Sequence, residues 1–476
     1  MKYTKSGIAA LLLTASMLFA CSSGSSSKDK QTDNQSEKNT SSVETEDTVQ
    51  APDVNYEGYA FRFLTTQEGW GYYQMNAEAT GDVLDDATWK RNRTMEEKIG
   101  IKIEETAEHY STVGDTFTKT VMAGEDAYDA ATLFLSNIVT YAQNNQLYPL
   151  DDLTGLHTEN PWWNRAAMGD ISISRNQYAL IGDINLMFYE SHYCMMFNQE
   201  MIARYDLENP YDLVKNGTWT FDRMLEMASA ATNDVNGNGT VDAGEDDCGI
   251  CLHSNASIPI ITAMGASLFT KNADGIPEFT GINDRFVNAY QKDCALYANT
   301  RLAQTQNTAK EVENGYKGVF ASGHSLFLIE VIGQLASMRG MTNEFGIVVL
   351  PKYDEASDYI SPVYHNAIGL CVPSTNSDAE RTGTILEYMA ALSYDTIRPV
   401  YYDIMLGSKL VRDEMSTESL DLILENGRFE TAYVYGWGDL TGLIHTNVNT
   451  NKTDIASLVE KKVKLIQKDM EKSLEN

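Results

Sequence analysis

Residues 22–54 contain no aromatic residue, and this stretch divides the 476-residue chain into parts that must behave differently. It consists mainly of Ser, Lys, Asp, Gln, Thr, Asn and Glu, so it buries too little apolar surface to offset the entropy lost on ordering. We therefore expect residues 21–54 to form a flexible tether. The roughly 420 residues that follow exceed the size of one ordinary domain, so we expect two or more lobes that begin near residue 55.

The N-terminus has the three parts of a secretory signal. A basic start precedes an apolar core from Ile8 to Phe19, which is too short for a typical transmembrane helix. The order Leu-Phe-Ala-Cys that ends at Cys21 resembles the bacterial lipobox, in which a peptidase cuts before the cysteine and its thiol carries diacylglycerol. Phe19 departs from that motif, and ordinary secretion with cleavage nearby is the alternative. We expect residues 1–20 to be a signal peptide and Cys21 to anchor the protein to the extracytoplasmic face of the cell membrane.

The composition, with 43% hydrophobic and 22% charged residues, is that of an ordinary globular protein. The formal net charge is −31 at pH 7. So acidic a protein is a poor candidate for binding nucleic acid or anionic lipid, and its charge favours solubility and cation binding.

Five cysteines follow Cys21, and an odd, scattered set of this kind is not a disulfide framework. Cys248 and Cys251 have the spacing of a redox or zinc motif, but no second pair accompanies them. We expect buried thiols, with a local disulfide between these two residues as the alternative.

Strand and helix patterns alternate along the rest of the chain, which predicts α/β lobes. The compact apolar run from Asp129 to Leu135 is typical of a buried parallel strand, and the segment after Trp219 places its apolar residues on one helix face. The main expected elements are strands over 59–65, 101–105, 129–135, 193–197 and 345–350, and helices over 88–99, 116–123, 284–297, 379–392 and 453–472.

The order of these elements resembles the extracellular solute-binding proteins of ABC importers, in particular the carbohydrate-binding group that includes maltose-binding protein. The resemblance covers essentially the whole chain after the tether, and it depends on the order and spacing of segments that are individually unspecific. These segments are Tyr128-Asp129, Leu147 to Asp152, Asn160 to Trp163, Met196 to Asn198, Gly217 to Thr220, Phe345 to Pro351 and Tyr435 to Trp437.

The resemblance implies an α/β, two-lobed periplasmic-binding-protein-like fold of type II, with a ligand cleft between the lobes. Lobe one would comprise residues 55–187 and 363–407, and lobe two residues 188–362 and 408–476. The chain would cross between the lobes near 187–190 and 362–365, where a few residues absorb the hinge rotation on closure.

The segment from Asp234 to Glu245 matches the calcium loop of an EF-hand through its twelfth position. Gly239 stands where that loop turns sharply. The loop is single and lacks an evident exit helix, so we expect a structural ion rather than a switch. The alternative is an acidic turn without an ion. The predicted calcium ligands are Asp234, Asn236, Asn238, the Thr240 carbonyl, Asp242 and Glu245.

Aromatic residues are candidate ligand contacts, since the C–H faces of a sugar ring stack on Trp or Tyr. Trp70 follows the first predicted strand, where α/β sheets place their ligand loops. Trp437 lies between two glycines and is predicted to be an exposed platform. Trp162 follows a proline in a connection and would line the cleft. For each, the alternative is packing between loops.

Four polar residues are further candidates. Asn137 follows the buried strand that begins at Asp129, and Glu190 lies at the first predicted crossing. The resemblance places Glu330 in the lobe-two segment that contacts sugar, and His365 at the second crossing. Solvated or hinge-stabilising roles are the alternatives for all four.

The chain lacks the zincin, serine-hydrolase and P-loop signatures, so we expect no enzyme activity. The leading hypothesis is a monomeric, lipid-anchored receptor that captures a carbohydrate, in particular an oligosaccharide, and delivers it to an ABC permease. A peptide or another polar solute is the alternative ligand. The alternative functions are a surface carbohydrate-active enzyme, which would turn over its substrate, and a glycan-binding adhesion or sensor module without a transporter.

Overall fold

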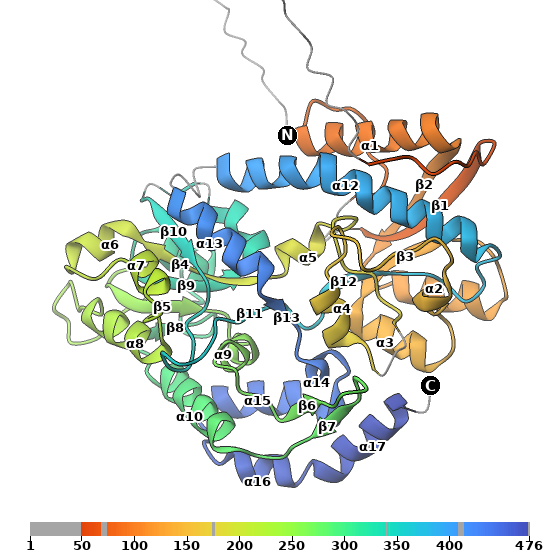
Figure 1. The fold of residues 1–476 in the computed structure, drawn as a ribbon. Helices are drawn as coiled ribbons and strands as arrows, with labels where there is room; N and C mark the ends of the chain where they lie inside the picture. The colour runs from red at the N-terminus through yellow and green to blue at the C-terminus, as the bar shows by residue number, and fades with distance from the viewer. Residues whose placement is uncertain are drawn as a thin grey trace, which may run out of the picture. The chain divides into compact units, whose positions relative to one another are not determined.

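The computed structural model describes residues 49–67, 74–173, 177–338, 340–341, 343–407 and 414–474. Cys21, most of the tether and Trp70 lie outside these residues. The body from Thr48 to Asn476 forms one unit with two separate main sheets, each flanked by helices (Figure 1). The prediction of a two-lobed α/β fold is confirmed.

The first lobe is built on a four-stranded sheet. Its elements are β1 (Tyr59–Gln67), α1 (Val83–Ile99), β2 (Ile101–His109), α2 (Val113–Met122), β3 (Ala130–Phe134), α3 (Leu135–Gln143), η1 (Leu150–Asp152), α4 (Arg165–Ile171), β12 (Ile368–Cys371) and α12 (Ala379–Gly407). The strand order is β12-β3-β1-β2, in which β1 pairs in parallel with β2 and β3, and β12 runs antiparallel to β3. The apolar residues of β3 are buried, as its compact apolar sequence predicts.

The second lobe is built on a five-stranded sheet. Its elements are β4 (Tyr193–Asn198), α6 (Gln199–Arg204), α7 (Pro210–Lys215), α8 (Phe221–Ala230), β5 (Cys248–Leu252), α9 (Ser257–Ala263), α10 (Asp284–Ala298), β8 (Ala303–Gln304), α11 (Gly315–Ala321), β9 (Ser325–Val331), η2 (Ile332–Met338), β10 (Phe345–Val348) and α13 (Glu414–Glu425). The order is β10-β4-β9-β5-β8, with β5 parallel to β8 and β9. Trp219 is fully buried at the start of α8, and its Nε1 donates to the Val349 carbonyl at 2.9 Å.

A hairpin and the C-terminal helices form a cluster that contacts both lobes. It comprises β6 (Phe269–Lys271), β7 (Pro277–Phe279), α14 (Thr431–Val434), η3 (Trp437–Asp439), α15 (Leu440–Asn449), α16 (Ile455–Glu460) and α17 (Val463–Leu474). In Figure 1 this cluster lies at the base of the molecule, where α15 contacts α9 and α10 while α14 contacts α3 and α4. The prediction of a single helix over 453–472 is wrong. The helix is interrupted at residues 461–462, and α17 packs against η3.

Three segments run side by side where the chain crosses between the lobes. They are the residues that follow α5 (Met187–Glu190), the short strand β11 (Ser361–Pro362) and the short strand β13 (Gly427–Arg428). β11 pairs in parallel with β13, and His192 forms an antiparallel bridge with Val363. No helix among the described residues is both long and apolar enough to cross a membrane.

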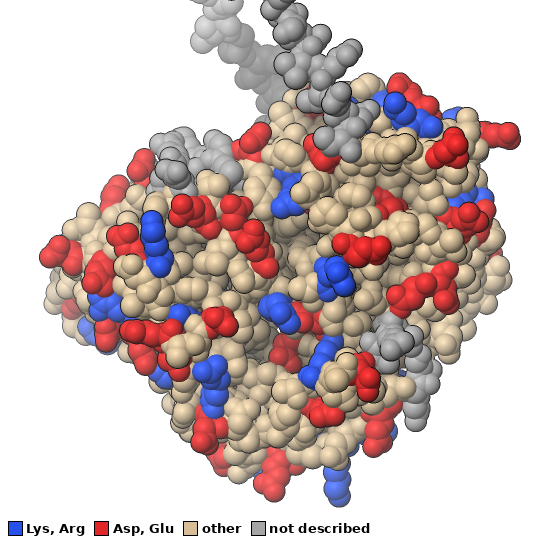
Figure 2. Space-filling view, viewed as in Figure 1, with Lys and Arg blue, Asp and Glu red and all other residues tan. Residues whose placement is uncertain are grey.

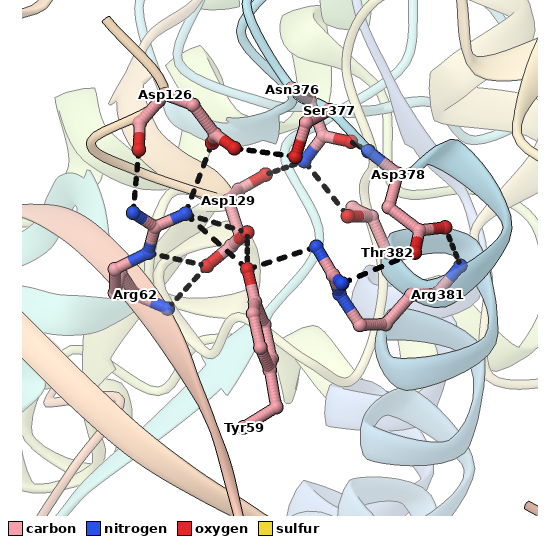
Figure 3. A network of polar contacts seen from close by, with 9 residues as sticks. All are labelled: Tyr59, Arg62, Asp126, Asp129, Asn376, Ser377, Asp378, Arg381 and Thr382. Atoms are coloured by element: carbon pink, nitrogen blue, oxygen red, sulfur yellow. Dashed lines mark hydrogen bonds and ion pairs between the residues drawn. The ribbon is translucent and has the colours of Figure 1, made fainter. Parts of the chain in front are cut away.

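A polar network ties the start of the first sheet to α12 (Figure 3). The fully buried carboxylate of Asp129 accepts from the backbone N–H of Arg62 at 2.8 Å, from its Nε at 3.0 Å and from the Tyr59 hydroxyl at 2.6 Å. Arg381 of α12 stacks on the Tyr59 ring and donates to its hydroxyl at 3.0 Å. These contacts fix β1, β3 and α12 in one arrangement.

Candidate functional site

A cavity of about 590 Å³ is lined by residues from both lobes. Several of these residues lie at strand ends: Tyr110 follows β2, Phe134 ends β3 and His253 follows β5. The carboxyl ends of parallel strands are where open α/β sheets bind their ligands. The lining comprises Tyr110, Phe134, Tyr193, His253, Asn255, Tyr316, Lys317, Glu330, Val331, Gln334, Tyr364 and Asn366.

Both lobes contribute aromatic rings to this cavity, and they differ in the charge that they supply. The rings of Tyr110 and Phe134, both from lobe one, meet edge to face with centroids 6.4 Å apart. Tyr110 is 46% exposed, so its ring is available to a ligand. Lobe two supplies both charged side chains of the lining, Lys317 and Glu330.

Glu330 is the buried acid of the cavity. It is 8% exposed, and its Oε2 accepts from the Tyr316 hydroxyl at 3.1 Å. Burial raises the pKa of its carboxyl, while the Lys317 ammonium and the Tyr316 hydroxyl oppose that rise. Lys317 in turn donates from Nζ to Gln334 Oε1 at 2.8 Å. The cavity therefore presents an ammonium and a carboxylate, each with capacity for further hydrogen bonds.

His253 is a hydrogen-bond donor in this cavity. Its Nδ1 accepts the backbone N–H of Asn255 at 3.1 Å, so the neutral ring carries its proton on Nε2. Burial, assisted by the charge of Lys317, lowers the pKa of His253 and favours that neutral ring. Asn366 is held by its Oδ1, which accepts the Ser136 N–H at 3.1 Å, and its side chain lines the cavity.

Glu330 is the one predicted contact residue, among those the structure describes, that lines this cavity. Asn137 does not line it, because β3 ends at Phe134 and Asn137 lies one turn further, in α3. Glu190 does not line it either. Its half-buried side chain lies in the crossing against Gly333, and burial raises the pKa of the carboxyl to about 7.

His365 and Trp162 also lie outside the lining. His365 is half-buried between two lining residues, and burial lowers its pKa to about 4. Trp162 donates from Nε1 to Glu387 Oε1 at 3.1 Å and borders a separate cavity of about 470 Å³ in lobe one. Its indole is therefore fixed in the packing between a loop and α12.

The prediction that Trp437 is an exposed platform is wrong. Its side chain is 1% exposed, and its Nε1 donates to Ser473 Oγ at 3.0 Å. The ring packs against Phe269 with centroids 5.4 Å apart. The two flanking glycines have φ values of 68° and 61°, and this backbone turns the indole into the C-terminal cluster instead of toward solvent.

The predicted calcium loop has the turn that such a loop needs. Gly239 has a φ of 94°, and the Asp234 carboxylate accepts the N–H groups of Gly237 and Gly239 at 2.6 and 2.7 Å. Asn238 Nδ2 donates to Asp242 Oδ2 at 2.8 Å. Among the described residues no three His, Cys, Asp or Glu side chains converge as a metal-binding group.

The five cysteines within the described residues are free and buried. The sulfurs of Cys248 and Cys251 are 3.9 Å apart inside β5.

The lining residues that sequence reasoning missed are mostly aromatic. Tyr110, Tyr193, Tyr316 and His253 all lie at or beside the ends of core elements. Only Tyr193, the first residue of the strand predicted over 193–197, carried a sequence signal of this position; no strand was predicted beside His253 or Tyr316. Acidic side chains are distributed over the face seen in Figure 2, consistent with the net charge of −31.

No family model matches the chain, and no curated protein matches it in sequence. The fold matches solved structures. A cyclo/maltodextrin-binding protein complexed with maltotetraose has a TM-score of 0.60 at 15% identity, over 87% of this chain and 99% of that one. An ABC substrate-binding protein from Listeria monocytogenes in complex with cycloalternan has a TM-score of 0.56 at 13% identity, over 87% of this chain and 99% of that one.

UgpB from Mycobacterium tuberculosis, in complex with glycerophosphocholine, has a TM-score of 0.56 at 16% identity, over 88% of this chain and 98% of that one. These matches extend over nearly all of each solved chain. The chain therefore has the two-lobed fold of the solute-binding proteins of ABC transporters.

Proposed function

We propose that this protein is the extracytoplasmic receptor of an ABC transporter, and that it captures a carbohydrate, in particular an oligosaccharide, between its lobes. The observation that carries the proposal is the cavity of about 590 Å³, which combines four tyrosines and a phenylalanine with amide and charged groups. Its volume is in the range of pockets that bury a small ligand. Rings for C–H faces and hydrogen-bonding groups for hydroxyls are what a sugar requires.

The proposed role is binding and delivery, without turnover. The similar structures in complex with maltotetraose and cycloalternan support a saccharide ligand. UgpB, in complex with glycerophosphocholine, indicates that the fold also accepts other polar solutes. A membrane permease would then receive the solute, and its ATPase subunits would supply the energy for transport.

A panel of mono- and oligosaccharides, with di- and tripeptides as the comparison set, tests the proposal. We expect a rise in thermal midpoint with at least one saccharide, because a ligand that binds only the folded state stabilises it by mass action. The saccharide should be recovered unchanged after incubation. Stabilisation by a peptide and by no saccharide would refute the carbohydrate proposal, and product formation would favour a carbohydrate-active enzyme.

We propose in addition that Cys21 carries a lipid. Its place between an apolar run and a polar tether supports the proposal, and an anchored receptor gains effective concentration beside its permease. Mass spectrometry of the membrane-extracted protein should find diacylglycerol on Cys21. A Cys21→Ala variant should lose membrane association, and retention of that variant in the membrane fraction would refute the lipid anchor.

We propose that the loop from Asp234 to Glu245 binds calcium as a structural ion. The support is the ligand pattern and the positive φ of Gly239. Calcium should raise the thermal midpoint and EDTA should lower it, while an Asp234→Ala variant should respond to neither. An unchanged midpoint in the wild-type protein would refute this proposal.

A further inference from the structure

Two buried polar atoms at the crossing between the lobes have no hydrogen-bond partner among the residues that the structure describes. They are Nε2 of His192 and Oγ of Ser361, and both side chains are 0% exposed. Buried polar atoms of this kind are uncommon, and each one in a folded protein calls for a physical explanation. Neither belongs to the ligand cavity.

The chemistry of the two atoms is complementary. Nδ1 of His192 lies 3.0 Å from the Phe188 carbonyl oxygen and 3.2 Å from that of Tyr189. Carbonyl oxygens only accept, so Nδ1 carries the proton and Nε2 is a bare acceptor. Complete burial lowers the pKa of His192 to about 4, which keeps the ring neutral. The hydroxyl of Ser361 has a proton to donate.

The strand register places the two side chains close together. His192 bridges Val363, so Ser361, two residues earlier on that strand, is its diagonal neighbour on the same face. Ser361 also pairs with Gly427. A Cβ on Gly427 would lie only 2.3 Å from Nε2 of His192, so the imidazole reaches across β11 to the third crossing segment. The register therefore places the hydroxyl and the imidazole on the same face of neighbouring strands, and no hydrogen bond joins them in the described structure.

These three segments are the ones that must twist against each other when the lobes move, because the chain passes between the lobes there. We propose that a hydrogen bond from Ser361 Oγ to His192 Nε2 forms in a second hinge conformation and biases the empty protein toward it. The conformation in the present structure leaves both groups without a hydrogen bond, and the free energy of that missing bond disfavours it relative to the second conformation. His192 and Ser361 are then positioning residues for the lobes. The inference rests on the two-lobed fold and is independent of the solute.

The test measures the distance between the lobes without any ligand. Exposed cysteines introduced as Met122→Cys in lobe one and Glu226→Cys in lobe two carry spin labels, while the native cysteines of the body are buried. Pulsed dipolar spectroscopy then gives the distance distribution. Ser361→Ala removes the donor, and we expect the ratio of the described conformation to the second one to rise about tenfold. Ser325→Ala, a buried serine of β9 away from the crossing, is the matched control.

A second variant distinguishes a hydrogen bond from a packing effect. His192→Phe removes the acceptor and keeps a ring against Gly427, so it should shift the distribution in the same direction as Ser361→Ala. The double variant should shift it no further, because both changes remove the same bond. An unchanged distribution for Ser361→Ala, or fully additive shifts in the double variant, overturns the inference. Because no solute is present, neither outcome depends on the carbohydrate proposal.

Discussion

Replacing Asp129 with alanine tests whether one buried carboxylate holds the first lobe together. The carboxylate is fully buried and receives the Arg62 backbone N–H, two guanidinium N–H groups and the Tyr59 hydroxyl, at 2.6 to 3.1 Å. The side chain of Arg62 is itself only 28% exposed. The substitution therefore leaves a half-buried cation, a backbone N–H and a hydroxyl without their acceptor, at the joint between β1, β3 and α12 (Figure 3).

Removing one partner of a buried, hydrogen-bonded ion pair destabilises a protein by roughly 3 to 5 kcal/mol, and we expect about 4 kcal/mol here. Asp126→Ala is the matched control. It removes a carboxylate that pairs with the same guanidinium at 3.0 Å, but its side chain is 33% exposed, so water can replace it. We expect that control to lose no more than about 1 kcal/mol.

Amide hydrogen exchange is the appropriate assay, because two lobes can open separately and one overall midpoint would average them. The amides of β1 and β3 should lose protection in Asp129→Ala by the expected free energy, while those of β4 and β9 in lobe two stay unchanged. Equal losses in the two variants, or a loss below about 1 kcal/mol in Asp129→Ala, would show that burial does not set the strength of this pair.

Three further variants probe a pH response, a helix end and the cavity. Burial, partly opposed by the Ser257 hydroxyl, raises the pKa of Asp293 to about 7 from 3.8. The unfolded chain ionises this group from about pH 4 while the folded protein keeps its proton to about pH 7, so stability falls over that interval. In urea unfolding, the free energy of unfolding of Asp293→Asn should exceed that of wild type by up to about 4 kcal/mol at pH 8 and by nothing at pH 3. A difference between the two proteins that stays constant with pH would contradict the raised pKa of Asp293. Lys271 donates to three carbonyls at the end of α4, at 2.5 to 2.8 Å, so Lys271→Met should lose about 2 kcal/mol in thermal unfolding, and an unchanged midpoint would argue against this cap. Glu330→Gln should weaken calorimetric binding of the identified solute about tenfold, without loss of thermal stability; unaltered affinity would remove Glu330 from the site.

Some core strands could be predicted from their apolar runs, although β9 (Ser325–Val331), at the centre of the second sheet, was not among them. The run that became β3 is short, continuous and bounded by polar residues, which is typical of a buried strand. The C-terminal helix was harder to predict. The apolar stripe of the predicted helix runs on past residues 461–462, but the helix itself is interrupted there. The interruption accompanies the packing of Ile466 against Gly438 of η3. That contact joins residues distant in sequence, and helical periodicity carries no information about it.

Trp437 shows why a local pattern can support opposite conclusions. Glycines on both sides of an aromatic residue free the backbone, and that freedom serves an exposed platform as well as a tight buried turn. The deciding fact is the close approach of Ile466 to Gly438, where a Cβ would lie at 2.4 Å. The glycine is required for packing, and the indole is covered as a consequence.

The cavity could be located only in part from the sequence. The chain has 26 tyrosines, so aromatic character alone selects nothing. Tyr110 and Tyr193 come to line one cavity only when β2 and β4, from different lobes, are placed beside each other. Glu330 was predicted by resemblance because it lies on a core strand whose order in the fold is fixed. Loop residues such as Asn255 have no such constraint.

The placement of both charged groups of the lining on lobe two has a consequence for how the proposed solute would be held. A solute seated on lobe two alone meets Lys317, Glu330 and the His253 donor, which fix its orientation through hydrogen bonds. It gains the rings of Tyr110 and Phe134 when lobe one covers it, and these rings also exclude water. Removing water strengthens the polar contacts already made. Both lobes therefore contribute rings to the cavity, whereas its two charged groups, Lys317 and Glu330, lie on lobe two alone.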